Sequence, residues 1–366
     1  MDATHNYCVI MAGGIGARFW PVSREDRPKQ FLHMSLDRKS FLRLAYERFS
    51  AIFPDDHIIV VSQRRYRDLV KEDLPEILDE NILLEPYSRN TAPCLALAAY
   101  TLLKRDPEAV MVATPADHII QDEDIFRDTI NRALCYASQS DALITLGIVP
   151  DHPDTNFGYI HGRQDGTEDE GKPIKVKTFT EKPDAELAEV FFHSGEFFWN
   201  SGIFVWRAQS IREELEKHMP ETSILFQGWE EALDTPAQDS FLERVYSSIS
   251  KISIDYAVME KTDKAWVFPS KFGWHDIGNW EALYSFVSSQ RAEPDGNVTV
   301  AGPSLCKDNH NTIVFASDKK KLIAVRGLDN FIVVDTGDVL LVCPRDEVSA
   351  KEVIANVAMP DYEKFR

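Results

Sequence analysis

Long apolar runs are missing from this chain of 366 residues. No stretch approaches the roughly twenty apolar residues that a helix needs to cross a membrane. The first residues, MDATHNY, are polar and lack the charged start and apolar centre of a secretory signal peptide. These absences predict a cytoplasmic protein that does not insert into a membrane.

Positive charge is also scarce. The 40 Lys and Arg residues are outnumbered by 59 Asp and Glu, which gives a net charge of −19. Nucleic acid and anionic membranes are therefore not expected as partners, because the average field of the protein repels them. A nucleotide substrate is not excluded, since a few local cations and a metal ion can hold phosphate groups.

Zinc-site patterns are absent as well. The five cysteines, at 8, 94, 135, 306 and 343, are never paired at the short spacing of a metal site. Most of them lie among apolar neighbours, so we expect buried free thiols. The ten histidines contain no pair at the spacing of zinc ligands on a helix.

Alternating strand and helix signals dominate the first 150 residues. Strands are predicted at residues 7–11, 57–62, 81–85, 109–114 and 142–148, and helices at 41–49, 64–78, 92–104 and 124–138. This alternation predicts an α/β, Rossmann-like domain, with a mixed, mainly parallel sheet and helices on both faces. Ligands of such sheets bind outside the carboxyl ends of the strands.

The second half of the chain has a more mixed pattern. Strands are predicted at 158–162 and 174–179, with a solvated acidic loop at 164–172 between them, and helices at 185–193, 209–217, 223–233 and 240–249. The composition shifts near residues 293–296, and short strands follow at 312–316, 322–325, 331–335 and 339–343. We therefore predict two domains, a catalytic domain over 1–292 and a small β domain over 297–366.

A glycine-rich loop with basic residues follows the first predicted strand. Gly13, Gly14 and Gly16 allow backbone N–H groups to approach a ligand closely, and Arg18, Arg24 and Lys29 add positive charge. The loop lacks the Walker pattern, and Phe occupies the place of the third glycine of the dinucleotide fingerprint. A plain turn between strand and helix is the alternative, but the added cations favour a polyphosphate-binding loop.

The loop resembles a known family signature. Residues 11–32, MAGGIGARFWPVSREDRPKQFL, are similar to the signature of sugar-1-phosphate nucleotidyltransferases, above all of the mannose-1-phosphate guanylyltransferase branch. Further blocks follow in the family's order: EPYSRNTAP (85–93), TPADH (114–118), FTEKP (179–183), FWNSGIF (198–204), SIDYAVMEK (253–261) and WHDIGNW (274–280). The resemblance covers nearly the whole chain.

The resemblance implies an activity and an assembly. It implies transfer of GMP from GTP to α-D-mannose 1-phosphate, with Mg²⁺ as cofactor and GDP-mannose and pyrophosphate as products. It also implies that the C-terminal segment is a partial left-handed β-helix that mediates a homodimer. Some relatives continue into an isomerase domain. The chain ends at residue 366 without clustered histidines, so isomerase activity is not expected.

Two aspartates are candidate metal ligands. Asp117 follows a predicted strand and Asp276 precedes a helix, and carboxylates in such places suit a hard cation. Asp is also common in turns and helix caps, which is the alternative for either residue alone. The resemblance places the metal on both. His118 and His275 adjoin them, and we expect both either to be structural or to support the metal ligands, because a phosphate monoester needs little activation as a nucleophile.

Cations at the phosphates are the second requirement, because phosphoryl-type transfer relies on positioning and charge neutralisation. The resemblance assigns catalytic roles to Arg18, Lys29 and Lys182. It assigns nucleotide binding to Ala12, Gly13, Gly14, Gly16, Arg18, Lys29, Glu85, Pro86, Arg89, Asn90, Thr91 and Asp117. Ser88 stands where the family often has Gly, so the shape of this loop is less well determined. Simple N-capping by Asn90 or Thr91 is the alternative role.

Sugar recognition is the third requirement. A carboxylate can accept hydrogen bonds from neighbouring hydroxyls, and an amide can both donate and accept. The resemblance assigns substrate binding to Gly158, Glu181, Lys182, Asn200 and Asp276. The aromatic residues Phe198, Trp199, Phe204 and Trp206 are predicted to pack in the core instead.

Two alternative functions stay open at this point. The first is the same chemistry with another sugar 1-phosphate or nucleotide, such as dTDP-glucose synthesis. The second is a catalytically silent subunit that senses a nucleotide sugar. The presence of Arg18, Lys29, Asp117, Lys182 and Asp276 speaks against a silent subunit.

Overall fold

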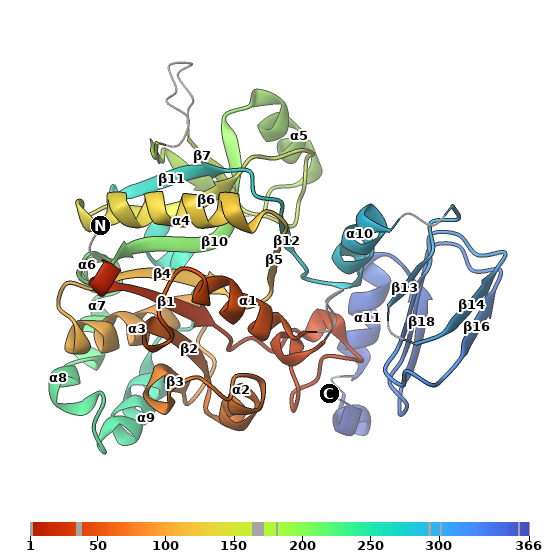
Figure 1. The fold of residues 1–366 in the computed structure, drawn as a ribbon, viewed down its shortest axis with the longest axis horizontal. Coiled ribbons are helices and arrows are strands. Elements are labelled where there is room, and N and C mark those ends of the chain that lie inside the picture. The colour runs from red at the N-terminus through yellow and green to blue at the C-terminus, as the bar shows by residue number, and fades with distance from the viewer. Residues whose placement is uncertain are drawn as a thin grey trace. The chain divides into compact units, whose positions relative to one another are not determined.

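A computed structural model describes residues 3–33, 39–162, 172–180, 182–291, 294–300, 302–357 and 359–365 (Figure 1). The chain forms two compact units. The first unit comprises Met1–Gly13, Tyr46–Ala116 and Ile120–Trp274, and the second comprises Gly14–Ala45, Asp117–Ile119 and His275–Arg366. The predicted acidic loop at 164–172, apart from its last residue, lies outside the described residues, as does Glu181.

A large mixed sheet is the centre of the first unit. Its main path runs β3 (Ile82–Glu85), β2 (Ile58–Gln63), β1 (Asn6–Met11), β4 (Val110–Pro115), β10 (Phe197–Arg207), β6 (Leu143–Ile148), β11 (Ala265–Ser270) and β8 (Ile174–Lys175). Strands β1 to β4 are mutually parallel, whereas β10 runs antiparallel to both of its neighbours. The mixed, mainly parallel sheet is confirmed, and its first four strands begin and end within one residue of the predicted bounds.

Helices cover both faces of this sheet. Helix α4 (Glu123–Ser138) packs on β4, β6, β10 and β11, and Figure 1 shows it lying across the sheet. Helices α3 (Thr91–Arg105) and α6 (Ala208–His218) pack on each other and on the other face, where Val9, Met111 and Trp206 belong to their hydrophobic cluster. Successive residues of a strand are thus buried on opposite faces of the sheet, because side chains along a strand alternate between the two faces.

The central strand β10 was not predicted. Its sequence, FFWNSGIFVWR, was interpreted as a family block that supplies core aromatics and the sugar-binding Asn200, and Phe198, Trp199, Phe204 and Trp206 are indeed buried. The pairing with β6 shifts register between Asn200 and Phe204, and Gly202 has a φ of 68°. This irregularity interrupts the alternation by which a strand is recognised in sequence.

Three predicted elements differ from the structure. The strand predicted at 174–179 is two strands, because β8 pairs with β11 while β9 (Thr178–Thr180) pairs with β7 (Tyr159–His161). The helix predicted at 223–233 is broken at Gly228, whose φ of 83° separates α7 (Pro220–Leu225) from α8 (Trp229–Ala232). The helix predicted at 64–78 is a 3₁₀ turn followed by α2 (Arg67–Asp73), which ends ahead of Pro75.

The other predicted helices are confirmed to within two residues at each end. These are α1 (Phe41–Ser50), α3, α4, α5 (Ala185–Ser194), α6 and α9 (Gln238–Ser248). Helix α9 lies on the same hydrophobic cluster as α3 and α6, through Phe241, Val245 and Tyr246.

The C-terminal part of the second unit is built from parallel strands. Strands β13 (Val298–Val300), β15 (Ile313–Ala316) and β17 (Phe331–Asp335) are parallel, and β18 (Leu340–Pro344) closes this sheet antiparallel. Strands β14 (Ser304–Lys307) and β16 (Ile323–Arg326) form a second parallel sheet. Val314, Ile323 and Val333 pack together in one small cluster. The predicted β-helix-like domain is confirmed.

Helices α10 (Trp280–Gln290) and α11 (Glu347–Val357) belong to the described part of the second unit. Helix α10 begins at the N-cap Asn279, whose side chain accepts from the N–H of Ala282. Helix α11 was not predicted, although Val353, Ile354 and Val357 follow a helical spacing and pack on the core of this unit.

The described part of the chain has two further general features. None of its helices combines the length and apolar character that crossing a membrane requires. All five cysteines are free thiols, and Cys8, Cys94 and Cys343 are buried as expected. Burial raises the pKa of the Cys8 and Cys94 thiols well above the ordinary value, which makes them poor nucleophiles.

Candidate active site

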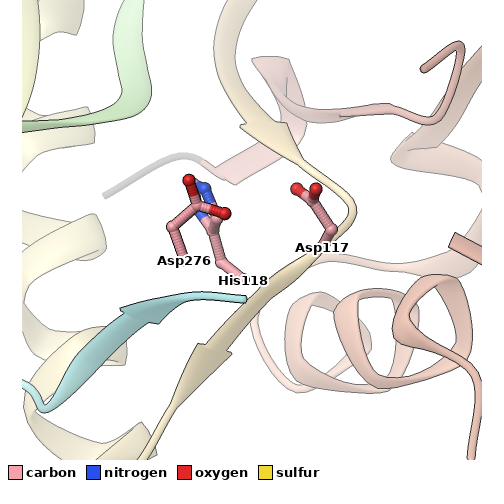
Figure 2. Close-up of side chains that lie close together, drawn as sticks. All are labelled: Asp117, His118 and Asp276. Atoms are coloured by element: carbon pink, nitrogen blue, oxygen red, sulfur yellow. The ribbon is translucent and has the colours of Figure 1, made fainter. Parts of the chain in front are cut away.

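Two carboxylates and an imidazole meet in the second unit. Asp117 lies in the turn between β4 and β5 (His118–Ile120), and Asp276 ends β12 (Trp274–Asp276). Strands β5 and β12 pair, which brings these distant segments together. One atom from each of Asp117, His118 and Asp276 lies within 4.8 Å of the other two, and Figure 2 shows Asp276 beside His118 with Asp117 facing them.

This donor set fits a divalent metal ion. Carboxylate oxygens are the preferred ligands of Mg²⁺ and also suit Mn²⁺, whereas an imidazole is more typical of other transition metals. Three protein ligands would leave coordination positions for water and phosphate oxygens. The sequence indicated the two aspartates, whereas the place of His118 in the cluster was not foreseen.

Lys29 lies against the same aspartates. Its Nζ is 2.7 Å from Oδ2 of Asp117 and 3.9 Å from Oδ1 of Asp276, and its side chain is only 4% exposed. The ammonium also lies over the rings of Phe19 and Phe41, at 5.5 and 5.3 Å. A buried ammonium is costly unless it is paired, so Asp117 is its counter-ion.

The ion pair fixes the charge of Asp117. Burial alone would raise the pKa of this carboxyl, but the charges of Lys29 and His118 lower it to about 2. Asp117 is therefore ionised throughout the physiological pH range and is available as a metal ligand.

Arg18 lies close to the backbone beside Asp276. It belongs to the short 3₁₀ helix η2 (Ala17–Phe19) and is exposed. A Cβ at Gly278 would come within 3.1 Å of its Nη2, so a glycine at 278 lets the guanidinium approach this turn closely. One compact unit thus contains Arg18, Lys29, Asp117 and Asp276. In this unit the exposed guanidinium of Arg18 is present in addition to the aspartates that are paired with Lys29.

The first half of the glycine loop is anchored to β2. The N–H of Ala12 donates to the Val61 carbonyl at 2.8 Å, and the Ser62 hydroxyl donates to the Ala12 carbonyl at 2.8 Å. The Gln63 amide donates to the Gly13 carbonyl at 2.6 Å. These bonds satisfy backbone carbonyls at the point where β1 ends.

A glycine is required at position 16 in the second half of the loop. Its φ is 66°, and a Cβ there would lie 2.4 Å from Cβ of Lys29. The Ser23 hydroxyl donates to the Ile15 carbonyl at 2.8 Å, which closes the loop on itself. Lys29 can therefore reach its buried place only because residue 16 has no side chain.

Glu85 lies buried under the start of the loop. It is 4% exposed, and a Cβ on Gly13 would lie 3.0 Å from its Oε2. The Tyr246 hydroxyl lies 3.0 Å from Oε1 of Glu85 and 3.1 Å from the Pro93 carbonyl. One hydroxyl proton cannot serve both acceptors, but a protonated Glu85 can donate to Tyr246 while Tyr246 donates to Pro93. Burial indeed raises the pKa of Glu85 to about 8.

The segment that follows Glu85 is held by residues far along the chain. Arg89 Nε donates to the Tyr246 carbonyl at 2.9 Å, and the N–H of Ile252 donates to the Arg89 carbonyl at 3.2 Å. Tyr87 is hydrogen-bonded to Glu243 of α9. Tyr246 and α9 carried no functional signal in the sequence, because their contribution comes from contacts that no local pattern encodes.

Asn90 and Thr91 begin α3. Asn90 has a φ of 70°, and its side chain accepts from the N–H of Thr91 at 2.8 Å, so Asn90 has the N-cap role that was the alternative to nucleotide binding. Thr91 Oγ1 accepts from the N–H of Ile254 at 2.8 Å. Asn90 and Thr91 therefore both fix the conformation of the backbone at the start of α3.

The predicted sugar-binding residues other than Asp276 belong to the first unit. The N–H of Asn200 donates to the Gly158 carbonyl at 2.8 Å, so these two residues are neighbours. The Asn200 amide donates to Asp255 at 2.7 Å. Asp255 belongs to the block SIDYAVMEK but was given no role in the sequence analysis. Lys182 is exposed with a φ of 26°, and Glu181 lies outside the described residues.

The sequence of the chain matches two protein-family models. The model of the nucleotidyl transferase family matches residues 7–293. The chain belongs to that family. A model described as a MannoseP isomerase/GMP-like beta-helix domain matches residues 305–356 of this nucleotidyl transferase, in agreement with its parallel C-terminal strands.

Individual relatives resemble this nucleotidyl transferase over almost its whole length. Mannose-1-phosphate guanylyltransferase of Escherichia coli strain K12 is 37% identical over 370 residues, covering 98% of this chain and 75% of the relative. The alginate biosynthesis protein AlgA of Pseudomonas aeruginosa is 35% identical, covering 95% and 71%. A crystal structure described as mannose-1-phosphate geranyltransferase from Thermus thermophilus is 31% identical with a TM-score of 0.83, covering 96% and 98%.

Proposed function

We propose that this nucleotidyl transferase transfers GMP from GTP to α-D-mannose 1-phosphate. A phosphate oxygen of the sugar phosphate attacks the α-phosphorus of GTP, the bond to the β-phosphate breaks, and pyrophosphate leaves. The 37% identity to a mannose-1-phosphate guanylyltransferase supports this choice of substrates. The cluster of Asp117, Asp276 and Lys29 supports the transfer chemistry.

We further propose that Mg²⁺ is held by Asp117 and Asp276, with His118 within reach. When bound, such an ion neutralises phosphate oxygens and orients the reactants. The two carboxylates place two negative charges side by side as ligands for the ion. The low pKa of Asp117 keeps its carboxylate ionised.

Cationic side chains would hold the phosphates. Arg18 offers a planar guanidinium fork that suits phosphate oxygens, and Lys29 and Lys182 offer compact charges. Catalysis of phosphoryl-type transfer is mainly positioning and charge neutralisation, so no general base is assigned. Neither His118 nor His275 is needed for proton abstraction in this scheme.

The remaining predicted residues would select the base and the sugar. We assign the guanine to the loop of Ala12 and Gly13 and to residues 85–91, whose conformation is fixed by the contacts of Tyr246 and Ile254. We assign the mannose to Gly158, Glu181, Lys182 and Asn200. The bond between Asn200 and Asp255 holds the amide in one orientation, as selection between hydroxyl groups requires.

Assembly and location complete the proposal. We propose a homodimer formed through the C-terminal β-rich segment, in the cytoplasm. Large apolar side chains on this segment are exposed, among them Leu305, Leu322, Leu340 and Val342 at 48% to 62%. Leu340 and Val342 lie on one face of β18, and contiguous apolar patches are typical of surfaces that another molecule covers.

The proposed function is tested by pyrophosphate release with a panel of sugar 1-phosphates and nucleoside triphosphates in the presence of Mg²⁺. GTP with mannose 1-phosphate is expected to give the highest kcat/KM. A different pair preferred by tenfold or more would overturn the substrate assignment. Tight binding of GDP-mannose without turnover of any pair would overturn the assignment as an enzyme.

Arg18→Ala is expected to lower kcat by about 10²-fold with a smaller effect on KM for mannose 1-phosphate. One charged donor aimed at developing negative charge contributes roughly this much to catalysis. Steady-state kinetics with Arg18→Lys as the graded variant checks the expectation. A wild-type kcat for Arg18→Ala would remove this residue from the reaction.

Lys29→Met is expected to tighten Mn²⁺ binding to the protein without nucleotide by about tenfold or more. The ammonium of Lys29 competes with a metal ion for Asp117, and unit charges at this range interact by several kcal/mol at the effective dielectric of a protein. Mn²⁺ binding is measured by electron paramagnetic resonance. Lys321→Met is the matched control, because Lys321 pairs with Asp335 at the same 2.7 Å. Unchanged or weaker binding in Lys29→Met contradicts the expectation.

A further inference from the structure

We propose that the C-terminal β-rich segment holds the phosphate-binding loop, residues 14–32, in its working conformation through Arg24 and Asp338. Both are then positioning residues for the reaction. The inference rests on the proposed function for its kinetic consequence, but its structural consequence can be tested without it. No motif in the sequence pointed to Asp338.

The guanidinium of Arg24 is engaged by protein acceptors on all three nitrogens. Nη1 and Nη2 donate to the two carboxylate oxygens of Asp338 at 2.7 and 2.8 Å. Nη2 also donates to the Thr336 hydroxyl at 3.2 Å, and Nε donates to the Pro21 carbonyl at 3.0 Å. Arg24 belongs to the basic signature loop, yet its charge is directed at the β-rich segment.

Arg24 and Asp338 form a bidentate ion pair, which is the geometry in which a surface ion pair contributes to stability. Most exposed ion pairs contribute little, but a bidentate Arg–carboxylate pair with a well-ordered partner is an exception. The Arg24 side chain is only 17% exposed. The hydrogen bonds from Arg24 lower the pKa of Asp338 to about 2, so this carboxylate keeps its charge at any physiological pH.

Asp338 is held in place by the turn between β17 and β18. The N–H of Thr336 donates to the Val339 carbonyl at 2.9 Å, and the Thr336 hydroxyl donates to Asp338 at 3.0 Å. The N–H of Gly337, which has a φ of 89°, donates to Asp335 at 3.0 Å. The acceptor for Arg24 is therefore preformed by the β-rich segment and does not depend on the loop.

A second attachment lies at Trp20. Its indole N–H donates to the Phe365 carbonyl at 2.7 Å, and its own carbonyl accepts from the indole of Trp280 at 3.1 Å. Trp20 is 8% exposed; its bond with Trp280 is buried, and its bond with Phe365 is partly buried. Helix α11 packs against η2, and Ile354 and Arg18 line one pocket. The loop is thus attached on both sides of Pro21.

These attachments lie between the two cations that the proposed reaction uses. Arg18 precedes Trp20, and Lys29 follows Arg24, so the anchored stretch joins the two phosphate clamps. A small displacement of positioned charges costs much of the rate, because catalysis here depends on geometry. Loss of the Arg24–Asp338 pair is therefore expected to lower kcat more than it raises KM for either substrate.

The experiment is a double-mutant cycle on kcat. Arg24→Ala and Asp338→Ala are each expected to lower kcat by about 10- to 100-fold, and the double variant to lose no more than either single variant. The exchanged pair, Arg24→Asp with Asp338→Arg, is expected to recover part of the loss. Arg326→Ala is the matched control, because Arg326 pairs with Asp308 at 2.8 Å elsewhere in the same segment and is expected to keep the wild-type kcat.

Amide hydrogen exchange supplies a readout that does not require turnover. Asp338→Ala is expected to raise exchange in residues 14–32 by about tenfold or more, while the core strands β1 and β4 keep wild-type protection. Arg326→Ala is expected to leave the loop unchanged. If the Asp338→Ala loop exchanges like the wild type, the inference is wrong even if kcat falls.

The outcomes separate this inference from the proposed function. Loss of kcat in Arg24→Ala but not in Asp338→Ala would mean that Arg24 acts on a phosphate, and the inference would fail. Additive losses would also refute it. A wild-type protein that turns over no substrate pair would overturn the proposed function, while the exchange measurement would still decide the anchoring.

Discussion

Asp276→Asn is expected to lower turnover by about a thousandfold or more while the fold stays intact. A metal ion contributes several kcal/mol of charge stabilisation to a phosphoryl transition state, which corresponds to a loss of this size. Asp276 is 30% exposed at the end of β12, and asparagine has nearly the same size and shape as aspartate. Steady-state kcat and Mn²⁺ binding, measured on the same preparation, check both halves of the expectation.

The control for Asp276→Asn is the same Asp-to-Asn substitution at a position away from the metal cluster. Asp329→Asn removes an aspartate whose side chain is 65% exposed and paired with His310 in the C-terminal segment, and it should retain wild-type turnover and metal binding. Circular dichroism and thermal unfolding of both variants establish that they are folded. Turnover of Asp276→Asn within tenfold of the wild type would rule out its role as a metal ligand.

Glu85→Gln is expected to stabilise the protein at alkaline pH. Burial raises the pKa of Glu85 to about 8 from an ordinary 4.5. The folded state therefore keeps a proton that the unfolded state releases between these two values. The contribution of Glu85 to stability is fully present below pH 4.5 and is lost as the pH rises through 8. The full loss is about 4–5 kcal/mol, at 1.36 kcal/mol for each pKa unit.

Urea unfolding at pH 6 and pH 9 measures this effect. Glutamine keeps the shape of a protonated glutamate and can donate to Tyr246, so the variant should lack the fall in unfolding free energy that the wild type shows between the two pH values. Glu108→Gln, at a side chain that is 74% exposed, is the control and should keep the wild-type pH dependence. Equal pH dependence in Glu85→Gln and the wild type would mean that Glu85 is ionised in the folded protein.

Local sequence patterns were sufficient for the parallel part of the fold. The apolar runs that became β1, β2, β3 and β4 are short, almost fully buried and bounded by turn residues, which is how a strand in a covered parallel sheet is recognised. The glycine loop and Asp117 follow two of these strands. Their placement at carboxyl ends was therefore predictable before any tertiary contact was known.

Features that depend on distant pairing were not predictable. Strand β10 has no clean alternation because its register shifts after Asn200, and its place between β4 and β6 comes from pairing alone. The roles of Tyr246 and Asp338 depend on bonds to Glu85 and Arg24, which lie far away in sequence. The C-terminal segment was expected only to form a dimer, and its contacts with residues 14–32 add a second role.

The order of the segments in the second unit has a consequence for biosynthesis. This unit combines residues 14–45 with residues 275–366, and the Trp20 indole N–H donates to the carbonyl of Phe365. A ribosome adds roughly 5–20 residues per second, so the early loop waits tens of seconds for the segment that anchors it. During synthesis the strands of the large sheet are therefore complete before the phosphate-binding loop is secured, because the loop is secured only after residue 365 has been made.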